Sequence, residues 1–239
     1  MARRRRGRSI GLVLVVVAVA VVVVAVFLTS GGSGSGSNAT VASAADLLKQ
    51  APAAKDAAGC DPVQTTPNYA DTPGADPSID HAHIGSAEAA TAPALSTYAT
   101  IPPASGPHSP VPLTAGIYSS PPDVYQTLHS LEHGATIIWY APGTTGKALD
   151  DLLAFYGQPQ SDADIGQAKI IIAPYSYPEL ATAGQLSSGV QMALVAWHRL
   201  ETCSTLNLAA AFDFSSRFEA PGYGGRTYAG AAREAGASI

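Results

Sequence analysis

The sequence contains little that would let it bind nucleic acid or perform redox chemistry on thiols. Charged residues make up 13% of the 239 residues, with 13 Lys and Arg against 18 Asp and Glu. Phosphate contacts need Lys and Arg, so an acidic chain is a poor nucleic-acid binder. The two cysteines form no C-x-x-C pair, and there is no glycine-rich phosphate loop or dinucleotide fingerprint. These absences disfavour the common nucleotide-binding and thiol-redox classes.

One long uncharged stretch lies near the start of the chain. Residues 10–28 consist almost wholly of Val, Ala, Leu and Ile. A helix over these residues would span about 28 Å, close to the bilayer hydrocarbon thickness of roughly 30 Å. Five arginines precede it, and positive flanks stay in the cytoplasm. We therefore predict a single-pass cell-membrane anchor with a cytoplasmic N-terminus and an extracytoplasmic C-terminal domain.

A cleaved signal peptide is the alternative for this stretch. Its apolar region would be shorter, roughly 7–15 residues, and followed by a small-residue cleavage site, which residues 29–32 do not provide. The five N-terminal arginines leave eight basic residues against 18 acidic ones, so the remainder has a net charge of −10. The predicted partner is the lipid bilayer, contacted through residues 10–28; an envelope protein partner stays open.

Cys60 and Cys203 are the only cysteines, and outside the cytoplasm disulfides persist. We predict one structural disulfide between them, which would tie the start of the domain to its end. The entropic model gives a few kcal/mol for a bridge that closes so long a loop. A redox or metal-binding pair is the alternative, which the lack of C-x-x-C disfavours.

Regular hydrophobic patterns begin near Gly116. Ser119 or Ser120 is a candidate cap for the first helix, Gly134 a stop signal, and Asn207 a cap for the last helix. The apolar spacing predicts helices at 122–133, 147–156 and 206–218, and buried strands at 135–140, 169–174 and 190–200. This order predicts an α+β domain in which a small mixed sheet packs against helices.

Composition divides the chain into five parts. Residues 31–37 are only Gly and Ser, which is typical of a flexible tether, and a short helix is expected within 41–50. Residues 61–100 are rich in Pro, Asp, Ala and Thr, so we expect coil wrapped on the domain, or partial disorder. The predicted parts are an Arg-rich cytoplasmic tail at 1–9, a transmembrane helix at 10–28, a flexible linker at 29–58, an extracytoplasmic domain at 59–219 and a loose C-terminal tail at 220–239.

The densest group of metal-binding or proton-transferring side chains is His129, Glu132 and His133. In a helix, the two histidines would lie one turn apart on one face. His108 follows a Ser-Gly-Pro turn that would fix the direction of its ring, and His83 offers a fourth ligand. Three or four such ligands suit a transition metal such as zinc or copper. The pattern predicts a metal-binding module with no assigned catalytic residue.

Two other interpretations compete with metal binding. A histidine beside a glycine stop interacts well with the last carbonyls of a helix, so the cluster fits a metal-free structural or interaction domain of the cell envelope. The spacing H-x-x-E-H also matches an inverted zinc peptidase, in which Glu132 would activate water. The helix ends at Gly134 instead of continuing, which disfavours this hydrolase.

Several segments together resemble domain-of-unknown-function family 3105. They are Tyr98, residues 101–108 (IPPASGPH), residues 116–118 (GIY), residues 129–134 (HSLEHG), residues 139–140 (WY) and residues 196–197 (AW). Ala104 departs from the usual Thr, and His198 stands where Gly is expected. The resemblance covers about residues 60–218. It implies a single-pass, membrane-anchored bacterial protein of a type common in actinobacteria, and it implies no established activity.

Overall fold

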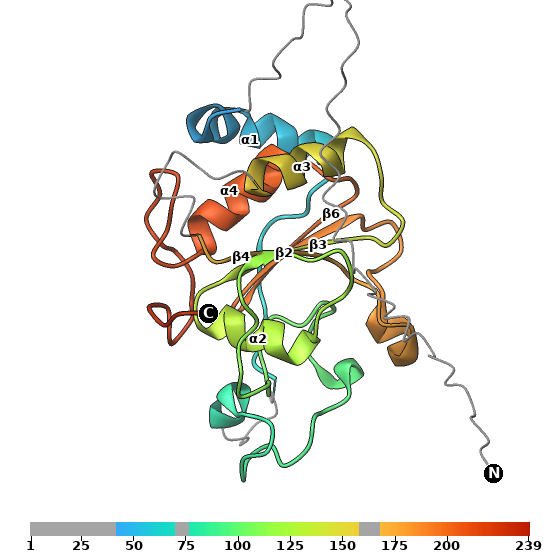
Figure 1. Cartoon of the computed structure of the whole chain (residues 1–239), viewed down its shortest axis with the longest axis vertical. Helices are drawn as coiled ribbons and strands as arrows, with labels where there is room; N and C mark the ends of the chain where they lie inside the picture. The colour runs from blue at the N-terminus through green and yellow to red at the C-terminus, as the bar shows by residue number, and fades with distance from the viewer. Residues whose placement is uncertain (1–41, 70–76, 158–167) are drawn as a thin grey trace, which may run out of the picture. The chain divides into compact units, whose positions relative to one another are not determined.

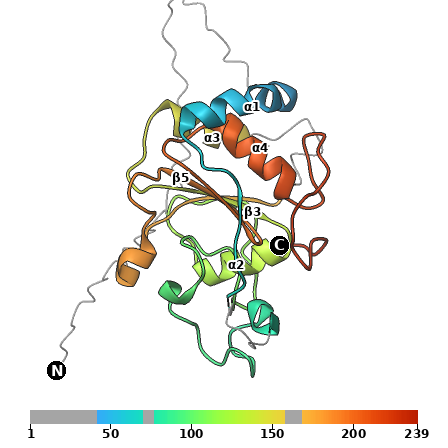
Figure 2. The ribbon, with the colours of Figure 1, turned by 180° about the vertical axis from the view of Figure 1, so that it is seen from behind.

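The computed structural model describes residues 42–69, 77–157 and 168–239, and a six-stranded mixed sheet lies at its centre (Figures 1 and 2). The strand order is β1-β6-β5-β3-β4-β2. β3 pairs parallel with β4 and antiparallel with β5. The strands are β1 Gln64–Thr65, β2 Gly116–Ile117, β3 Thr136–Tyr140, β4 Ile170–Pro174, β5 Met192–Ala196 and β6 Arg199–Cys203. The predicted α+β class with a mixed sheet is confirmed.

Helices cover both faces of this sheet. Figures 1 and 2 show α1, α3 and α4 on one face and α2 on the other. The α-helices are α1 Ala44–Ala58, α2 Val124–Glu132, α3 Lys147–Gly157 and α4 Leu208–Phe218; the 3₁₀ helices are η1 Pro77–His81, η2 Leu95–Thr97 and η3 Pro178–Gly184. Asn207 caps α4 as predicted, accepting hydrogen bonds from the backbone N–H groups of Ala209 and Ala210.

The central strands belong to two hydrophobic cores at once. Along β3, Ile138 and Tyr140 pack with α1, α3 and α4, whereas Ile137 and Trp139 pack with α2. Successive side chains of a strand point to opposite faces, so both sets are buried. This burial explains why the strands are continuous apolar runs in the sequence.

The strand predicted at 190–200 is wrong in its extent, because the chain reverses within it. β5 ends at Ala196, and β6 begins at Arg199 and pairs with it antiparallel. His198 at the turn has φ 56°, a left-handed conformation uncommon for any residue but glycine. The segment contains none of the Asn-Gly or Asp-Gly signals that mark tight hairpins, so its apolar pattern resembles one long strand.

The described domain extends beyond both boundaries predicted for it. Residues 44–58, predicted as linker, form α1, which packs against α4. Residues 220–239, predicted as a loose tail, return to α2, where the backbone N–H of Glu234 donates to the carbonyl oxygen of Glu132. Within the described residues, no helix combines the length and apolarity needed to cross a bilayer. The predicted anchor at 10–28 lies outside them.

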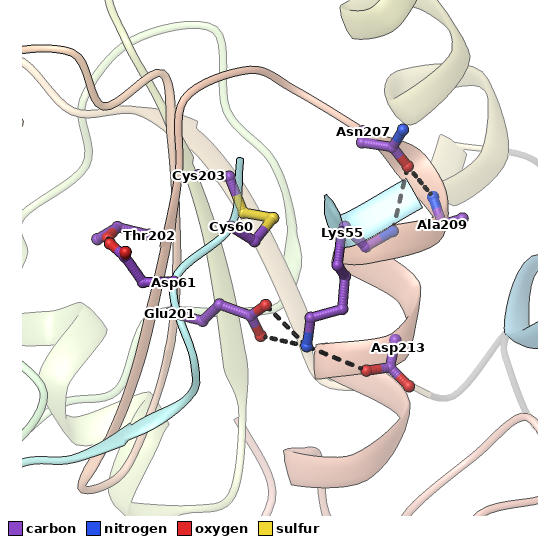
Figure 3. The surroundings of a disulfide bond; sticks show 10 residues. Lys55, Cys60, Asp61, Glu201, Thr202, Cys203, Asn207, Ala209 and Asp213 are labelled. Carbon is purple, nitrogen blue, oxygen red and sulfur yellow. Dashed lines mark hydrogen bonds and ion pairs between the residues drawn. A yellow bond between two sulfur atoms is a disulfide. The ribbon is translucent and has the colours of Figure 1, made fainter. Parts of the chain in front are cut away.

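The predicted Cys60–Cys203 disulfide is present, and it joins the end of α1 to β6 (Figure 3). Lys55 extends this connection, because its Nζ lies 2.7 Å from Glu201 Oε1 on β6 and 3.4 Å from Asp213 Oδ2 on α4. Glu201 is fully buried and therefore depends on this cation for charge compensation. The contacts fix α1 to both the sheet and α4.

Glu219, at the end of α4, gives the domain an expected pH dependence. Its buried carboxylate accepts a hydrogen bond from the backbone N–H of Lys169, but burial dominates and raises the pKa of Glu219 to about 7. The folded protein thus binds this proton more tightly than the unfolded chain, in which the glutamate pKa is about 4.3. The stabilisation that the folded protein gains from this tighter proton binding is complete below about pH 4.3, and it is lost as the pH rises through about 7.

Between pH 4.5 and 7, the free energy of unfolding of Glu219→Gln should fall by about 1–3 kcal/mol less than that of the wild type. Urea unfolding at several pH values measures this difference. Glu88→Gln, at an exposed position, is the matched control and should keep the wild-type pH dependence. An unchanged pH dependence in Glu219→Gln would show that Glu219 is ionised in the folded state.

Candidate metal centre

α2 carries three of the candidate side chains to one end of the domain. Its N-cap is Asp123, which accepts from the backbone N–H groups of Tyr125 and Gln126, so the predicted caps Ser119 and Ser120 are wrong. Leu128 and Leu131 are fully buried and pack into the core beneath the helix. His129, Glu132 and His133 consequently project from its last turn.

The predicted stop at Gly134 is confirmed by its backbone. Its φ of +86° is left-handed, and a Cβ atom there would lie 2.5 Å from the Cβ of Ala220. A glycine is therefore needed here both for the left-handed backbone conformation and for the close approach of the C-terminal segment. This close packing brings the C-terminal residues beside the end of α2.

Two loops bring the other histidines to the same place. His83 and His108 face each other in an isolated parallel β-bridge, in which His108 N–H donates to Ala82 O at 3.0 Å. Gly106 has φ +120°, and a Cβ there would lie 2.7 Å from the Tyr98 ring. The Ser-Gly-Pro turn before His108 is thus held rigidly, as its sequence predicts.

Asp80 holds in place the two loops that carry His83 and His108. Its Oδ1 accepts hydrogen bonds from the Tyr69 backbone N–H and the Ser105 hydroxyl, and its Oδ2 lies 3.0 Å from His198 Nε2. Burial raises the pKa of Asp80, but these hydrogen bonds and the charge of His198 outweigh it and lower the pKa overall. Asp80 and His198 therefore support the loops from outside the group of candidate ligands.

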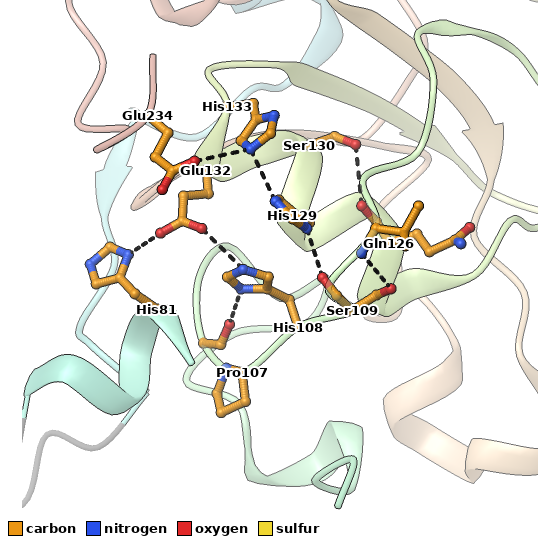
Figure 4. A network of polar contacts seen from close by, with 12 residues as sticks. His81, Pro107, His108, Ser109, Gln126, His129, Ser130, Glu132, His133 and Glu234 are labelled. Atoms are coloured by element: carbon orange, nitrogen blue, oxygen red, sulfur yellow. Dashed lines mark hydrogen bonds and ion pairs between the residues drawn. The ribbon is translucent and has the colours of Figure 1, made fainter. Parts of the chain in front are cut away.

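Six side chains form what we call the histidine cluster: His83, His108, His129, Glu132, His133 and Glu234. Figure 4 labels all of them except His83. They fall into two overlapping groups, in each of which one possible ligand atom per residue lies within 4.8 Å of the others. The inner group is His83, His108, His129 and Glu132; the outer group is His129, His133 and Glu234. In the inner group only His83 is exposed.

Backbone carbonyls orient three of these imidazole rings. The Nδ1 atoms of His108, His129 and His133 lie 2.8, 2.7 and 2.7 Å from the carbonyl oxygens of Gly106, Ser109 and Ser238. A carbonyl oxygen only accepts, so each Nδ1 carries a proton. In a neutral ring, Nε2 then presents its lone pair to the cluster. Ligating histidines are commonly held in this way.

Two contacts inside the cluster bring such acceptors face to face. His108 Nε2 lies 3.0 Å from Glu132 Oε2, and both side chains are buried. His129 Nε2 lies 3.0 Å from His133 Nε2. Two lone pairs at this distance repel unless a proton or a cation lies between them. Ligands of a tetrahedral zinc ion lie about 3.3 Å apart, so both contacts fit a shared metal ion.

His129 is a poor site for the proton that would relieve its contact with His133. The ring centres of His83, His108 and His129 lie 4.8–5.1 Å apart, and those of His129 and His133 lie 4.5 Å apart. Burial, together with repulsion from His108, His133 and His83, lowers the pKa of His129 to about 4, against the opposing hydrogen bond to Ser109. His129 is therefore neutral at pH 7 and ready to bind a metal without losing a proton.

Glu132 is held as a carboxylate by two histidines. His81 Nδ1 lies 2.5 Å from its Oε1, and the His81 ring stacks on Trp197 with the ring centres 5.0 Å apart. Burial raises the pKa of Glu132, but the hydrogen bonds and charges of His108 and His81 lower it overall to about 2. A base with so low a pKa accepts protons poorly near neutral pH, so Glu132 suits a ligand better than the water-activating role of a peptidase.

The structure brings the predicted ligands together in a changed arrangement. His83, His108 and His129 converge as predicted, but their fourth neighbour is Glu132, while His133 faces the outer group. Sequence reasoning missed His81 as the residue that orients Glu132. It also missed Glu234, whose carboxylate lies 3.2 Å from His133 Nε2. Glu234 stands in no motif that would have revealed it, whereas His81 stands two residues before the candidate ligand His83.

The fold and the cluster define an α+β domain with a buried His–Glu site at one end of a mixed sheet. The chain belongs to the DUF3105 family, described as proteins of unknown function, whose model matches residues 92–231. This range includes His108, His129, Glu132 and His133, whereas His83 and Glu234 lie outside it. No curated protein and no solved structure gives a significant match.

Proposed function

We propose that this protein is a membrane-anchored, extracytoplasmic module that binds one transition-metal ion, zinc or copper, in its inner group. The observation that carries the proposal is the convergence of the inner group: one possible ligand atom from each of four side chains lies within 4.8 Å of the others, and His108 Nε2 lies 3.0 Å from the buried Glu132 Oε2. His83 and His129 complete a donor set of three imidazoles and one carboxylate, which suits both metals.

Anchoring in the bilayer is supported by the apolar stretch at 10–28 and the arginines before it. The disulfide is consistent with an oxidising compartment outside the cytoplasm. The hydrolase alternative is disfavoured because both Glu132 oxygens already contact histidines. Two surface cavities, of about 540 and 510 Å³, include none of the cluster residues in their linings.

The test is the metal content of the purified full-length protein after incubation with zinc or copper and removal of excess ion. Elemental mass spectrometry should find about one equivalent of metal in the wild type. Glu132→Gln should bind zinc about 10–100-fold more weakly, because the amide removes the negative ligand and its pairing with His81. Glu88→Gln is the control, since it makes the same change at an exposed site.

Two results would contradict the proposal. Wild-type protein that retains neither zinc nor copper has no such site, and the cluster is then structural. Equal zinc affinity in Glu132→Gln and Glu88→Gln would place any bound metal away from the inner group.

A further inference from the structure

We infer that the C-terminal segment builds a second, outer metal position from His129, His133 and Glu234. This inference deepens the proposed function and rests on it, because the two positions share His129. The contact that carries it is a separate one, the 3.0 Å approach of His129 Nε2 to His133 Nε2. Glu234 Oε2 lies 3.2 Å from His133 Nε2 and supplies a negative charge beside it. Figure 4 shows the two side chains facing each other.

The C-terminal segment is attached around this position by its backbone. The Glu234 N–H donates to the carbonyl oxygen of Glu132, and the Ser238 carbonyl oxygen accepts from His133 Nδ1. Lys169 Nζ donates to the carbonyl oxygens of both His133 and Ala237. The segment therefore orients the His133 ring as well as providing a carboxylate.

The two positions are alternatives for a single ion. His129 Nδ1 is committed to the carbonyl oxygen of Ser109, so the ring has one free nitrogen and binds one metal at a time. An ion that moves between the positions keeps its bond to His129 Nε2 and exchanges His133 and Glu234 for His83, His108 and Glu132. This exchange involves no change in oxidation state.

Exposure differs between the two positions. The Glu234 side chain is 58% exposed, whereas that of Glu132 is 5% exposed. The outer position has three protein ligands and leaves room for solvent or a donor molecule, and the inner position has four. We therefore assign the outer position to the arriving or departing ion, with the weaker affinity, and the inner position to the stored ion.

The test uses full-length protein and zinc, titrated in competition with a chromophoric chelator. His83→Ala/Glu132→Gln disables the inner position and should retain about one equivalent of zinc, bound about 10–100-fold more weakly than in the wild type. Adding Glu234→Gln to that variant should weaken binding at least another tenfold. Glu234→Gln alone should change the wild-type affinity less than about threefold, because the ion then resides in the inner position.

Hydrogen exchange gives a second readout that does not depend on affinity. In the His83→Ala/Glu132→Gln background, zinc should slow exchange of the amides of residues 230–239, and Glu234→Gln should abolish that protection. Glu88→Gln in the same background is the matched control and should preserve the protection.

The outcomes separate this inference from the proposed function. Equal zinc affinity and equal exchange with and without Glu234→Gln, in the inner-disabled background, would overturn the outer position while leaving the inner site intact. Zinc binding that is lost with Glu234→Gln alone but not with His83→Ala/Glu132→Gln would support the outer position and overturn the proposed inner site. A wild type that binds no zinc overturns both.

Discussion

The His129→Ala variant is expected to bind zinc more than about 100-fold more weakly than the wild type, the largest loss for any single side chain of the cluster. His129 is the residue common to the inner and outer groups, so its removal weakens both positions together. Burial lowers the pKa of His129 to about 4, so its ring is neutral at pH 7 and binds a metal without releasing a proton. A competition titration with a fluorescent zinc chelator at pH 7 measures the loss.

His198→Asn is the control for this variant. It removes a histidine outside both groups, and asparagine tolerates the left-handed backbone found at that position. Its effect on zinc affinity should be much smaller, because the His198 side chain reaches the loops through Asp80 and the substitution keeps the backbone hydrogen bond from His198 to Ala104. If His198→Asn and His129→Ala weaken zinc binding equally, the loss reflects damage to the fold and the assignment of His129 as a ligand fails.

Removing the disulfide should have the largest effect on stability. In Cys60→Ala/Cys203→Ala, the unfolded chain regains the freedom of a loop with a sequence separation of 143 residues. The entropic model predicts a loss of about 4–5 kcal/mol in the free energy of unfolding. For a domain of this size, such a loss lowers the melting temperature by roughly 8–20 °C, which calorimetry or circular dichroism measures.

Reductant provides the matched control for that prediction. Dithiothreitol should lower the melting temperature of the wild type by a similar amount and leave that of the double variant unchanged. A shift below about 2 °C in the variant would mean that Lys55, with Glu201 and Asp213, already fixes α1 to the rest of the domain without the disulfide.

Much of the fold could be predicted because its signals are local. β3 and β4 are buried on both faces and therefore form continuous apolar runs, and Asn207 and Gly134 mark helix ends through their own backbone preferences. The disulfide followed from the number of cysteines and their expected compartment. The β5–β6 hairpin could not be predicted, because its turn at His198 is held by contacts with residues far away, including Asp80 and Ala104.

The candidate site was predictable only in its composition. The spacing of His129 and His133 indicated that they share a helix face, and the turn before His108 indicated a fixed ring. The pairing of His83 with His108 and the return of Glu234 to His133 depend on contacts between distant segments. No local pattern specifies such contacts. The same reason explains why Glu132, and not His133, completes the inner group.

X-ray absorption spectroscopy of the zinc-loaded, full-length wild type tests the central claim most directly. Our account predicts imidazole scattering from about three histidines together with a carboxylate oxygen, all at about 2.0–2.2 Å from zinc, and no sulfur ligand. Glu132→Gln should reduce the oxygen contribution in that shell. A spectrum of zinc surrounded only by water oxygens, or one with sulfur at about 2.3 Å, would contradict the assignment of the histidine cluster as the metal site.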